Sequence, residues 1–300
     1  MIVWLVILGF TIGTVLGSLV KALADRSLKG QSFWGRSYCP RCKKNLRWYD
    51  LFPVFSYILL RGKCRYCQKP IPLEYLQVEV LMGFLIALLF LIKLPANILD
   101  LNFISASLIW IELAFNIFII CILMVVFITD IKEGFIFDRV VLPAVIITAI
   151  YLVLVSAYKV YLIYNSIVHS AIGRYLLPPY SDYFYRHAIL AIYPLWTGLV
   201  AAVIIGIFFG LLIFITKGKG MGGGDLKYGI FLGLAFGFPN SVLVLLLAFL
   251  IGALVGIIVL ILGKKKFGQT IPFGPFLSIG GLLTIFWGQQ ILDWYLSLRF

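Results

Sequence analysis

Long apolar runs separated by short polar or basic segments dominate the hydrophobic pattern of this chain. An α-helix needs about 20 apolar residues to cross a bilayer, and fewer where neighbouring protein shields it. The pattern predicts eight membrane segments, at residues 2–22, 75–93, 108–129, 139–163, 189–215, 226–237, 240–262 and 274–296. The sixth is too short to cross upright, so we expect it to be tilted or shielded by its neighbours. The predicted fold is an all-α polytopic membrane protein with about eight transmembrane helices.

The composition excludes an ordinary soluble domain. The 300 residues are 62% hydrophobic and 12% charged, whereas a soluble domain is about 45–50% apolar and about 25% charged. The first twenty residues lack a basic start and a small-residue cleavage site. They are therefore expected to be a retained first helix rather than a removed signal peptide.

The formal net charge of +13 would suggest a nucleic-acid partner in a soluble protein. In a membrane protein the positive-inside rule is the simpler explanation, because cytoplasmic loops collect Lys and Arg. With the N-terminus outside, the cytoplasm receives residues 21–74, 130–139, 216–227 and 263–273, which hold 20 of the 25 Lys and Arg residues. We therefore expect these four segments at the cytoplasmic face, and no nucleic-acid partner.

Two C-x-x-C pairs lie between the first two predicted spans, with 21 residues between the pairs. Two such knuckles can deliver four thiolates to one tetrahedral centre, which suits Zn²⁺. The predicted topology places them in the reducing cytoplasm, where disulfides are disfavoured. The pattern predicts a closed structural zinc site, and a pair of redox dithiols is the alternative. The predicted ligands are Cys39, Cys42, Cys64 and Cys67.

Glycines at four-residue spacing occur in two predicted helices. Gly9, Gly13 and Gly17 lie in the first, and Gly252 and Gly256 in the seventh. This spacing permits close contact between helices in lipid. It predicts packing rather than chemistry.

Two acidic residues stand at the edges of apolar spans. The glycine-rich turn GMGGGDLKYG, which begins at Gly220, contains Asp225, and Asp130 ends another span at the same predicted face. An ionisable group there is costly unless it has a function, and two carboxylates at one depth can share a proton, as in aspartic proteases. The alternatives are that Asp225 caps a flexible hairpin and that Asp130 pairs with Lys132 in a surface turn.

These motifs together resemble the type IV prepilin peptidases, the bacterial leader peptidase/N-methyltransferases. The cysteine segment, from SYCPRCKKNL to GKCRYC, is similar to the N-terminal signature of that family, and QVEVLMG is similar to its following glutamate–glycine helix. Asp130 and Asp225, the latter in GGGDLK, fall at its two catalytic aspartates, and IPFGPFL resembles its closing motif. Beyond the two aspartates, the resemblance implies a substrate loop at Gly222, Gly223, Gly224 and Lys227, and methyl-transfer candidates at Glu79 and Gly83.

The activity that the resemblance implies is removal of the leader from prepilins and pseudopilins at a Gly–Phe junction on the cytoplasmic face. Methylation of the new N-terminal amine by S-adenosylmethionine would follow, in the bacterial inner membrane. We divide the chain into a first transmembrane helix at 1–22, a cytoplasmic zinc-binding module at 23–74 and a peptidase core of seven helices at 75–300. The rival interpretations are a peptidase without methyltransferase activity, a proton-coupled transporter and a silent membrane scaffold.

Overall fold

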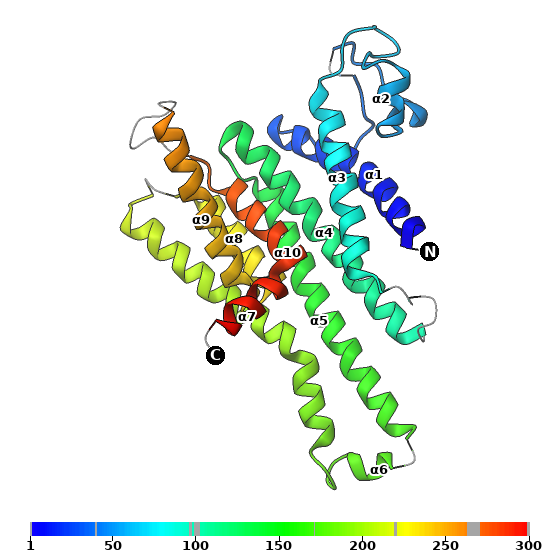
Figure 1. Ribbon diagram of the computed structural model, residues 1–300, viewed down its shortest axis with the longest axis vertical. Coiled ribbons are helices and arrows are strands. Elements are labelled where there is room, and N and C mark those ends of the chain that lie inside the picture. The colour runs from blue at the N-terminus through cyan, green and yellow to red at the C-terminus, as the bar shows by residue number, and fades with distance from the viewer. Residues whose placement is uncertain are drawn as a thin grey trace. The chain divides into compact units, whose positions relative to one another are not determined.

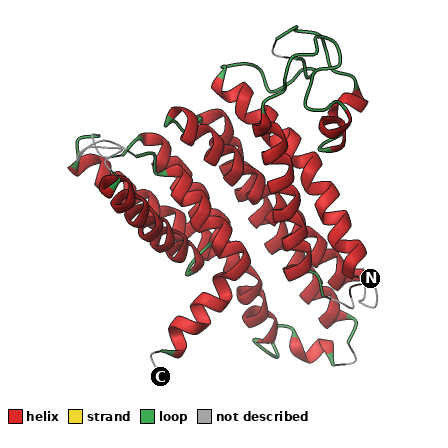
Figure 2. Cartoon of the chain, turned by 45° about the horizontal axis from the view of Figure 1, so that its top comes forward, coloured by secondary structure: helices red, strands yellow, loops and turns green. Residues whose placement is uncertain are grey.

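The computed structural model of this chain describes residues 2–39, 41–95, 98, 103–170, 172–218, 221–262 and 271–298. Gly220 and most of the predicted inner loop at 263–273 lie outside these residues. The described part of the chain is almost entirely helical and contains no named β-strand, which confirms the all-α prediction. Figure 2 shows the helices in red, with the segment between the first two long helices drawn mostly as loop.

All eight predicted membrane segments are helices. Their bounds are α1 Ile2–Leu28, α3 Leu73–Lys93, α4 Phe103–Glu133, α5 Asp138–Val168, α7 Tyr183–Ile215, α8 Gly223–Phe236, α9 Asn240–Ile261 and α10 Gly274–Ser297. Seven of them are long and apolar enough to cross a membrane, within the described residues. The exception is α8, with 14 residues, as its short apolar run indicates. Three shorter elements lie in the connections: η1 Trp48–Leu51, α2 Phe55–Leu59 and α6 Gly173–Leu176.

Several helices extend beyond the apolar stretch that predicts them. Helix α1 continues through Lys21, Asp25 and Arg26 to Leu28, and α7 begins at Tyr183 rather than near residue 189. Hydropathy marks only the part of a helix that lipid solvates, whereas the backbone hydrogen bonds continue wherever the side chains tolerate helical geometry. These helices are therefore longer than predicted, and their additional turns are more polar.

The chain forms two compact units. The N-terminal unit comprises residues 1–135 and 285–287, so it contains α1, the cysteine segment, α3 and α4 (Figure 1). Helices α1 and α3 pack closely through glycines: a methyl group added at Gly13 would lie 2.5 Å from the carbonyl oxygen of Met82, and one at Gly17 would lie 2.7 Å from the Cα of Glu79. Gly9 meets the Phe90 ring in the same way. The predicted packing role of these three glycines is confirmed.

The C-terminal unit comprises residues 136–284 and 288–300, with α8 packed mainly against α7 and α5. A methyl group at Gly233 would lie 2.6 Å from the Cα of Ala202, and one at Gly229 would lie 2.4 Å from the Phe209 ring. The spacing of Gly229 and Gly233 is the same four-residue signal, and it was not recognised from the sequence.

The packing predicted for α9 is only partly present. An added methyl group at Gly252 would lie 3.3 Å from the Phe276 ring, but at Gly256 no described atom lies within 4 Å. The prediction for Gly256 is therefore wrong among the described residues, because this face of α9 meets no neighbouring helix there. Four-residue glycine spacing permits close approach but does not require it.

Candidate functional site

The four cysteines of the two C-x-x-C pairs converge on one point in the N-terminal unit. All four sulfur atoms lie within 4.8 Å of one another, and Cys39 Sγ is 4.0 Å from Cys67 Sγ. A tetrahedral zinc with Zn–S bonds of about 2.3 Å would hold its sulfurs about 3.8 Å apart. The donor set therefore fits one tetrahedral metal ion. Convergence of both pairs on a single centre favours a metal over two separate redox dithiols.

The two cysteine knuckles repeat the same backbone geometry. In the first, the Cys39 N–H donates to the Lys44 carbonyl at 3.0 Å, and Lys43 takes a positive φ of 56°. In the second, the Cys64 N–H donates to the Lys69 carbonyl at 2.9 Å, and Gln68 takes a φ of 54°. An isolated β-bridge closes each knuckle. The repeat holds each pair of thiols on one side of a tight turn.

The environment that the thiols share lowers the pKa of Cys39 and raises the pKa of Cys67. Burial acts to raise the pKa of the Cys39 thiol, but backbone N–H groups of Cys42 and Arg41 donate to its sulfur and bring the pKa down to about 7. A backbone hydrogen bond at Lys69 acts to lower the pKa of Cys67, yet burial and the neighbouring sulfurs raise it to about 11. Four thiols this close cannot all ionise alone, so a cation that binds them must displace protons.

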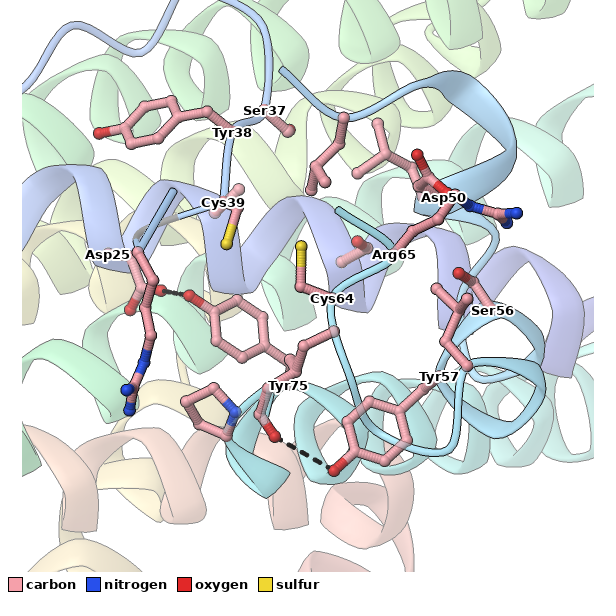
Figure 3. Close-up of a pocket in the computed structure, with 18 of the residues that line it drawn as sticks. Asp25, Ser37, Tyr38, Cys39, Asp50, Ser56, Tyr57, Cys64, Arg65 and Tyr75 are labelled. Atoms are coloured by element: carbon pink, nitrogen blue, oxygen red, sulfur yellow. Dashed lines mark hydrogen bonds and ion pairs between the residues drawn. The ribbon is translucent and has the colours of Figure 1, made fainter. Parts of the chain in front are cut away.

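A pocket of about 330 Å³ opens beside the cysteine cluster, inside the N-terminal unit. It lies between the C-terminal part of α1, the N-terminal part of α3 and the cysteine segment. Figure 3 shows the sulfur atoms of Cys39 and Cys64 directed toward each other among the lining residues, and the Tyr75 hydroxyl directed at Asp25. Its wall combines acidic, aromatic and basic side chains, among them Asp25, Glu79, Tyr57, Tyr75 and Arg41.

A network of charges joins the three long helices at one end of this unit. Lys21 of α1 is 2% exposed and pairs with Asp25 one turn later, while the Tyr75 hydroxyl donates to Asp25 at 2.6 Å. Glu74 of α3 lies 3.5 Å from the Lys21 ammonium and pairs with Lys132 of α4. Sequence reasoning missed this network. The available signal was a lysine and an aspartate four residues apart in one helix.

The two methyl-transfer candidates occupy different surroundings on α3. Glu79 is 8% exposed, lines the pocket and accepts the backbone N–H of Val54 at 2.8 Å. Gly83 lies in the contact with α1, where an added methyl group would come within 2.8 Å of the Phe10 ring and 2.9 Å of Thr14. The structure therefore brings Glu79 to the pocket and places Gly83 in helix packing.

Asp130 is buried, at 3% exposed, near the C-terminal end of α4. It does not stand in a surface turn, and its neighbour Lys132 pairs with Glu74 of α3. A buried carboxylate on an apolar helix is a candidate for function.

Asp225 lies in the first turn of α8, where its carboxylate accepts the backbone N–H of Gly222 at 3.3 Å. An acid at this position interacts favourably with the helix dipole, so the capping role and the catalytic role are both compatible with the contact. No described atom would lie within 4 Å of a methyl group at Gly223, which leaves that backbone accessible. Lys227 pairs with Asp138 at 2.7 Å. The joint action of Asp130 and Asp225 stays a prediction.

These features define a class: a multi-pass helical membrane protein with a four-cysteine cluster, an adjoining pocket and an acidic residue on each of two helices. Residues 11–93 match the bacterial peptidase A24 N-terminal domain, and residues 117–257 match the type IV leader peptidase family. The chain belongs to this family of leader peptidases. No solved structure matches it.

Alignments with known relatives cover most of this chain. It is 28% identical to a prepilin leader peptidase/N-methyltransferase of Legionella pneumophila, over 90% of this chain and 78% of the relative. Proteins of the same name from Aeromonas salmonicida (strain A449) and Burkholderia pseudomallei (strain K96243) are 27% and 30% identical. These matches cover 87% and 84% of this chain, and 75% and 67% of the respective relatives.

Proposed function

We propose that this chain is a membrane aspartic endopeptidase that removes the leader from prepilins and pseudopilins and then methylates the new N-terminal amine. The observation that carries the proposal is the match of both family segments in one chain, to relatives whose names state both activities. The family does not favour a transporter. A peptidase without methyltransferase activity is not favoured either, because the names of the relatives state both activities.

Asp130 and Asp225 are the proposed peptidase residues. One carboxylate takes a proton from a water molecule while the oxygen of that water attacks the carbonyl carbon of the Gly–Phe bond. The other carboxyl group protonates the carbonyl oxygen. The tetrahedral intermediate then collapses, the C–N bond breaks and the departing nitrogen receives a proton. The exposed backbone of Gly222 and Gly223 is the proposed contact for an extended substrate, because main-chain groups can pair with a peptide there. Gly224, where an added methyl group would lie 3.0 Å from Ile136, completes the proposed substrate loop.

Methyl transfer requires the new N-terminal amine in its neutral form. Its nitrogen lone pair attacks the methyl carbon of S-adenosylmethionine, and the S–C bond breaks with its electron pair going to sulfur. The sulfonium becomes a neutral thioether, and the methylated nitrogen releases one proton to a base or to water. A site for this step must therefore accommodate a sulfonium cation.

Cys39, Cys42, Cys64 and Cys67 are the proposed ligands of one structural Zn²⁺. Four thiolates fill a tetrahedral shell, so the metal would cross-link the two knuckles and leave no position for a catalytic water. We place the cysteine module and both aspartates at the cytoplasmic face of the bacterial inner membrane, on the distribution of Lys and Arg. The proposed partners are prepilin substrates and the lipid bilayer.

A cleavage assay in detergent tests the proposal. A prepilin-like substrate with a basic leader and a Gly–Phe junction is incubated with wild type, Asp130→Asn and Asp225→Asn, with and without S-adenosylmethionine. Asp182→Asn, at the start of α7, is the matched control. Each catalytic variant should lose cleavage while remaining folded, and the wild-type product should gain the mass of one methyl group. Full cleavage by either variant would refute the pair, and cleavage without methyl gain would remove the transferase half.

A further inference from the structure

Five large apolar side chains in and just before α2 are exposed. Phe55, Ile58 and Leu59 stand at positions i, i+3 and i+4 of this helix, which share one face, and they are 62%, 62% and 66% exposed. Leu51 and Phe52, just before α2, are 38% and 56% exposed. Figure 1 shows α2 at the outer edge of the cysteine segment. An exposed apolar patch of this kind marks a contact with a partner or a membrane, and we call these five residues the α2 surface.

The other side of α2 is fixed to the beginning of α3. The backbone N–H of Val54, the residue that precedes α2, donates to the Glu79 carboxylate at 2.8 Å. The Tyr57 hydroxyl donates to the carbonyl oxygen of Ile71 at 3.2 Å, and Ser56 is buried. These contacts hold α2 beside the first turns of α3 and leave its apolar face exposed.

The length of α3 sets the depth of this attachment in a membrane. Helix α3 has 21 residues, close to the roughly 20 that a crossing requires, so its first turn lies near the edge of the hydrocarbon region. Glu79 is the seventh residue of α3, about 9 Å from its start at a rise of about 1.5 Å per residue. Interfacial helices bury their apolar face to a similar depth of about 5–10 Å. The contact between Val54 and Glu79 therefore holds the start of α2 at the level of the membrane interface.

The charges next to the α2 surface are all positive. Residues 51–73 contain no acidic residue, and their basic residues are Arg61, Lys63, Arg65 and Lys69. Arg61 and Lys63 directly follow α2 and are exposed, and neither forms an ion pair with a described residue. Basic side chains beside an apolar face are typical of a segment that lies on an anionic membrane. A second copy of this chain would bring the same positive charges to the α2 surface, so charge favours lipid over self-association.

We propose that the α2 surface inserts into the interface of the bilayer, with its apolar side chains among the upper acyl carbons and with Arg61 and Lys63 on the phosphates of anionic lipids. The inference goes beyond the proposed function and does not depend on cleavage or methylation, since it requires only that α3 crosses a membrane. The cysteine segment then has a third attachment to the bilayer besides α1 and α3. This attachment limits how far the four cysteines can move from the membrane surface.

A photoreactive probe identifies what covers the α2 surface. A benzophenone-bearing amino acid replaces Phe55 in the full-length chain, in vesicles of phosphatidylcholine alone and of phosphatidylcholine with phosphatidylglycerol. Irradiation joins the probe to C–H bonds in contact with it, and mass spectrometry distinguishes a lipid adduct from a cross-link to a second copy. The probe at position 55 should join lipid, with a higher yield when phosphatidylglycerol is present. The same probe in place of Asn45, an exposed residue of the first knuckle, is the matched control and should join no lipid.

A double substitution tests the apolar part of the contact. Ile58→Ser with Leu59→Ser should lower the yield of lipid adduct at position 55 by about tenfold, because the transfer of two large apolar side chains into the bilayer is lost. The same change at Leu296 and Leu298, which are also exposed, is the matched control and should leave that yield unchanged. The Ile58→Ser, Leu59→Ser variant should keep the wild-type unfolding midpoint in detergent, because both side chains are exposed in the protein.

A second double substitution tests the basic part. Arg61→Gln with Lys63→Gln should abolish the higher adduct yield in phosphatidylglycerol, because the attraction to anionic headgroups is lost. Lys43→Gln with Lys44→Gln makes the same change of charge in the first knuckle and should keep the difference between the two lipids. Equal loss in both variants would show a response to overall charge and would refute the contact of Arg61 and Lys63 with lipid phosphate.

Other outcomes would overturn the insertion itself. A cross-link from position 55 to a second copy, in place of lipid, would assign the α2 surface to self-association. Absence of any adduct would show that the surface faces water, and equal lipid labelling at positions 45 and 55 would remove the assignment to α2. A lipid yield unchanged by the loss of Ile58 and Leu59 would remove the apolar face from the contact. Each of these results would leave the proposed cleavage and methylation untouched.

Discussion

Gly233→Ala tests whether the position of α8 depends on backbone contact with α7. The added methyl group would lie 2.6 Å from the Cα of Ala202 and 2.7 Å from its backbone nitrogen. Favourable carbon–carbon contacts lie at about 3.5–4.0 Å, so the two helices must separate locally by about 1 Å. Neither contacting atom belongs to a side chain that could rotate away. The strain must therefore move a helix.

Two effects on the free energy of unfolding oppose each other. Overpacking costs about 1–3 kcal/mol, and replacing a helical glycine by alanine returns about 0.5–1 kcal/mol. The expected net loss of stability is about 1–2 kcal/mol. The effect on cleavage should be larger, because α8 also carries Asp225, and misplacing a catalytic group by about 1 Å can cost about 100-fold in rate.

The assay pairs thermal unfolding in detergent with initial rates of prepilin cleavage. Gly256→Ala in α9 is the control, since no described atom lies within 4 Å of its added methyl group. It should keep full activity and lose no stability. If Gly233→Ala matched this control in both measurements, the close contact between α7 and α8 would not position α8, and the argument would be refuted.

Three other changes probe the N-terminal unit and the acidic loop. Removing the metal with a chelator, or introducing Cys39→Ser, should loosen the cysteine module, as measured by elemental analysis together with thermal unfolding. Metal affinity should also fall as the pH drops, because a proton competes with the metal for each thiolate below the pKa of its thiol, which is about 11 for Cys67 and about 7 for Cys39. Lys21→Met should destabilise the protein by about 3 kcal/mol, because it leaves the carboxylate of its i+4 partner without a cation, while Lys93→Met at the far end of α3 should not. Lys227→Met should change stability by less than about 1 kcal/mol, since its ion pair with Asp138 is exposed. A larger change in the unfolding midpoint would show that this pair has a structural role.

The parts of the fold that depend on local composition could be predicted from the sequence. Apolar runs locate the long helices, because lipid exposure requires an uninterrupted apolar surface. The C-x-x-C spacing predicts the cysteine cluster, because each knuckle fixes its own two thiols. The start of α8 could not be predicted in the same way. Gly223 and Gly224 are helical, although a run of glycines indicates a turn. The Asp225 carboxylate accepts the Gly222 N–H and so stabilises a helical first turn.

The pocket could not be predicted, because its wall comes from residues that are distant in the chain. Tyr75 and Asp25 are 50 residues apart, and Glu79 reaches Val54 across 25 residues. Neither pair follows a sequence period. Motif position alone suggested Glu79 and Gly83 together, whereas contacts divide them between a pocket and a helix interface.

The buried Lys21 has a consequence for the order in which this protein is synthesised and inserted. Its partner Asp25 is on the same helix, so the charge of Lys21 is compensated as soon as α1 forms. Tyr75 of α3, which completes the contact, leaves the ribosome 50 residues after Asp25. At about 5–20 residues per second, this delay is about 3–10 s. The cysteine segment emerges entirely within that interval, so its four cysteines can bind a metal ion before α3 is available to pack against α1.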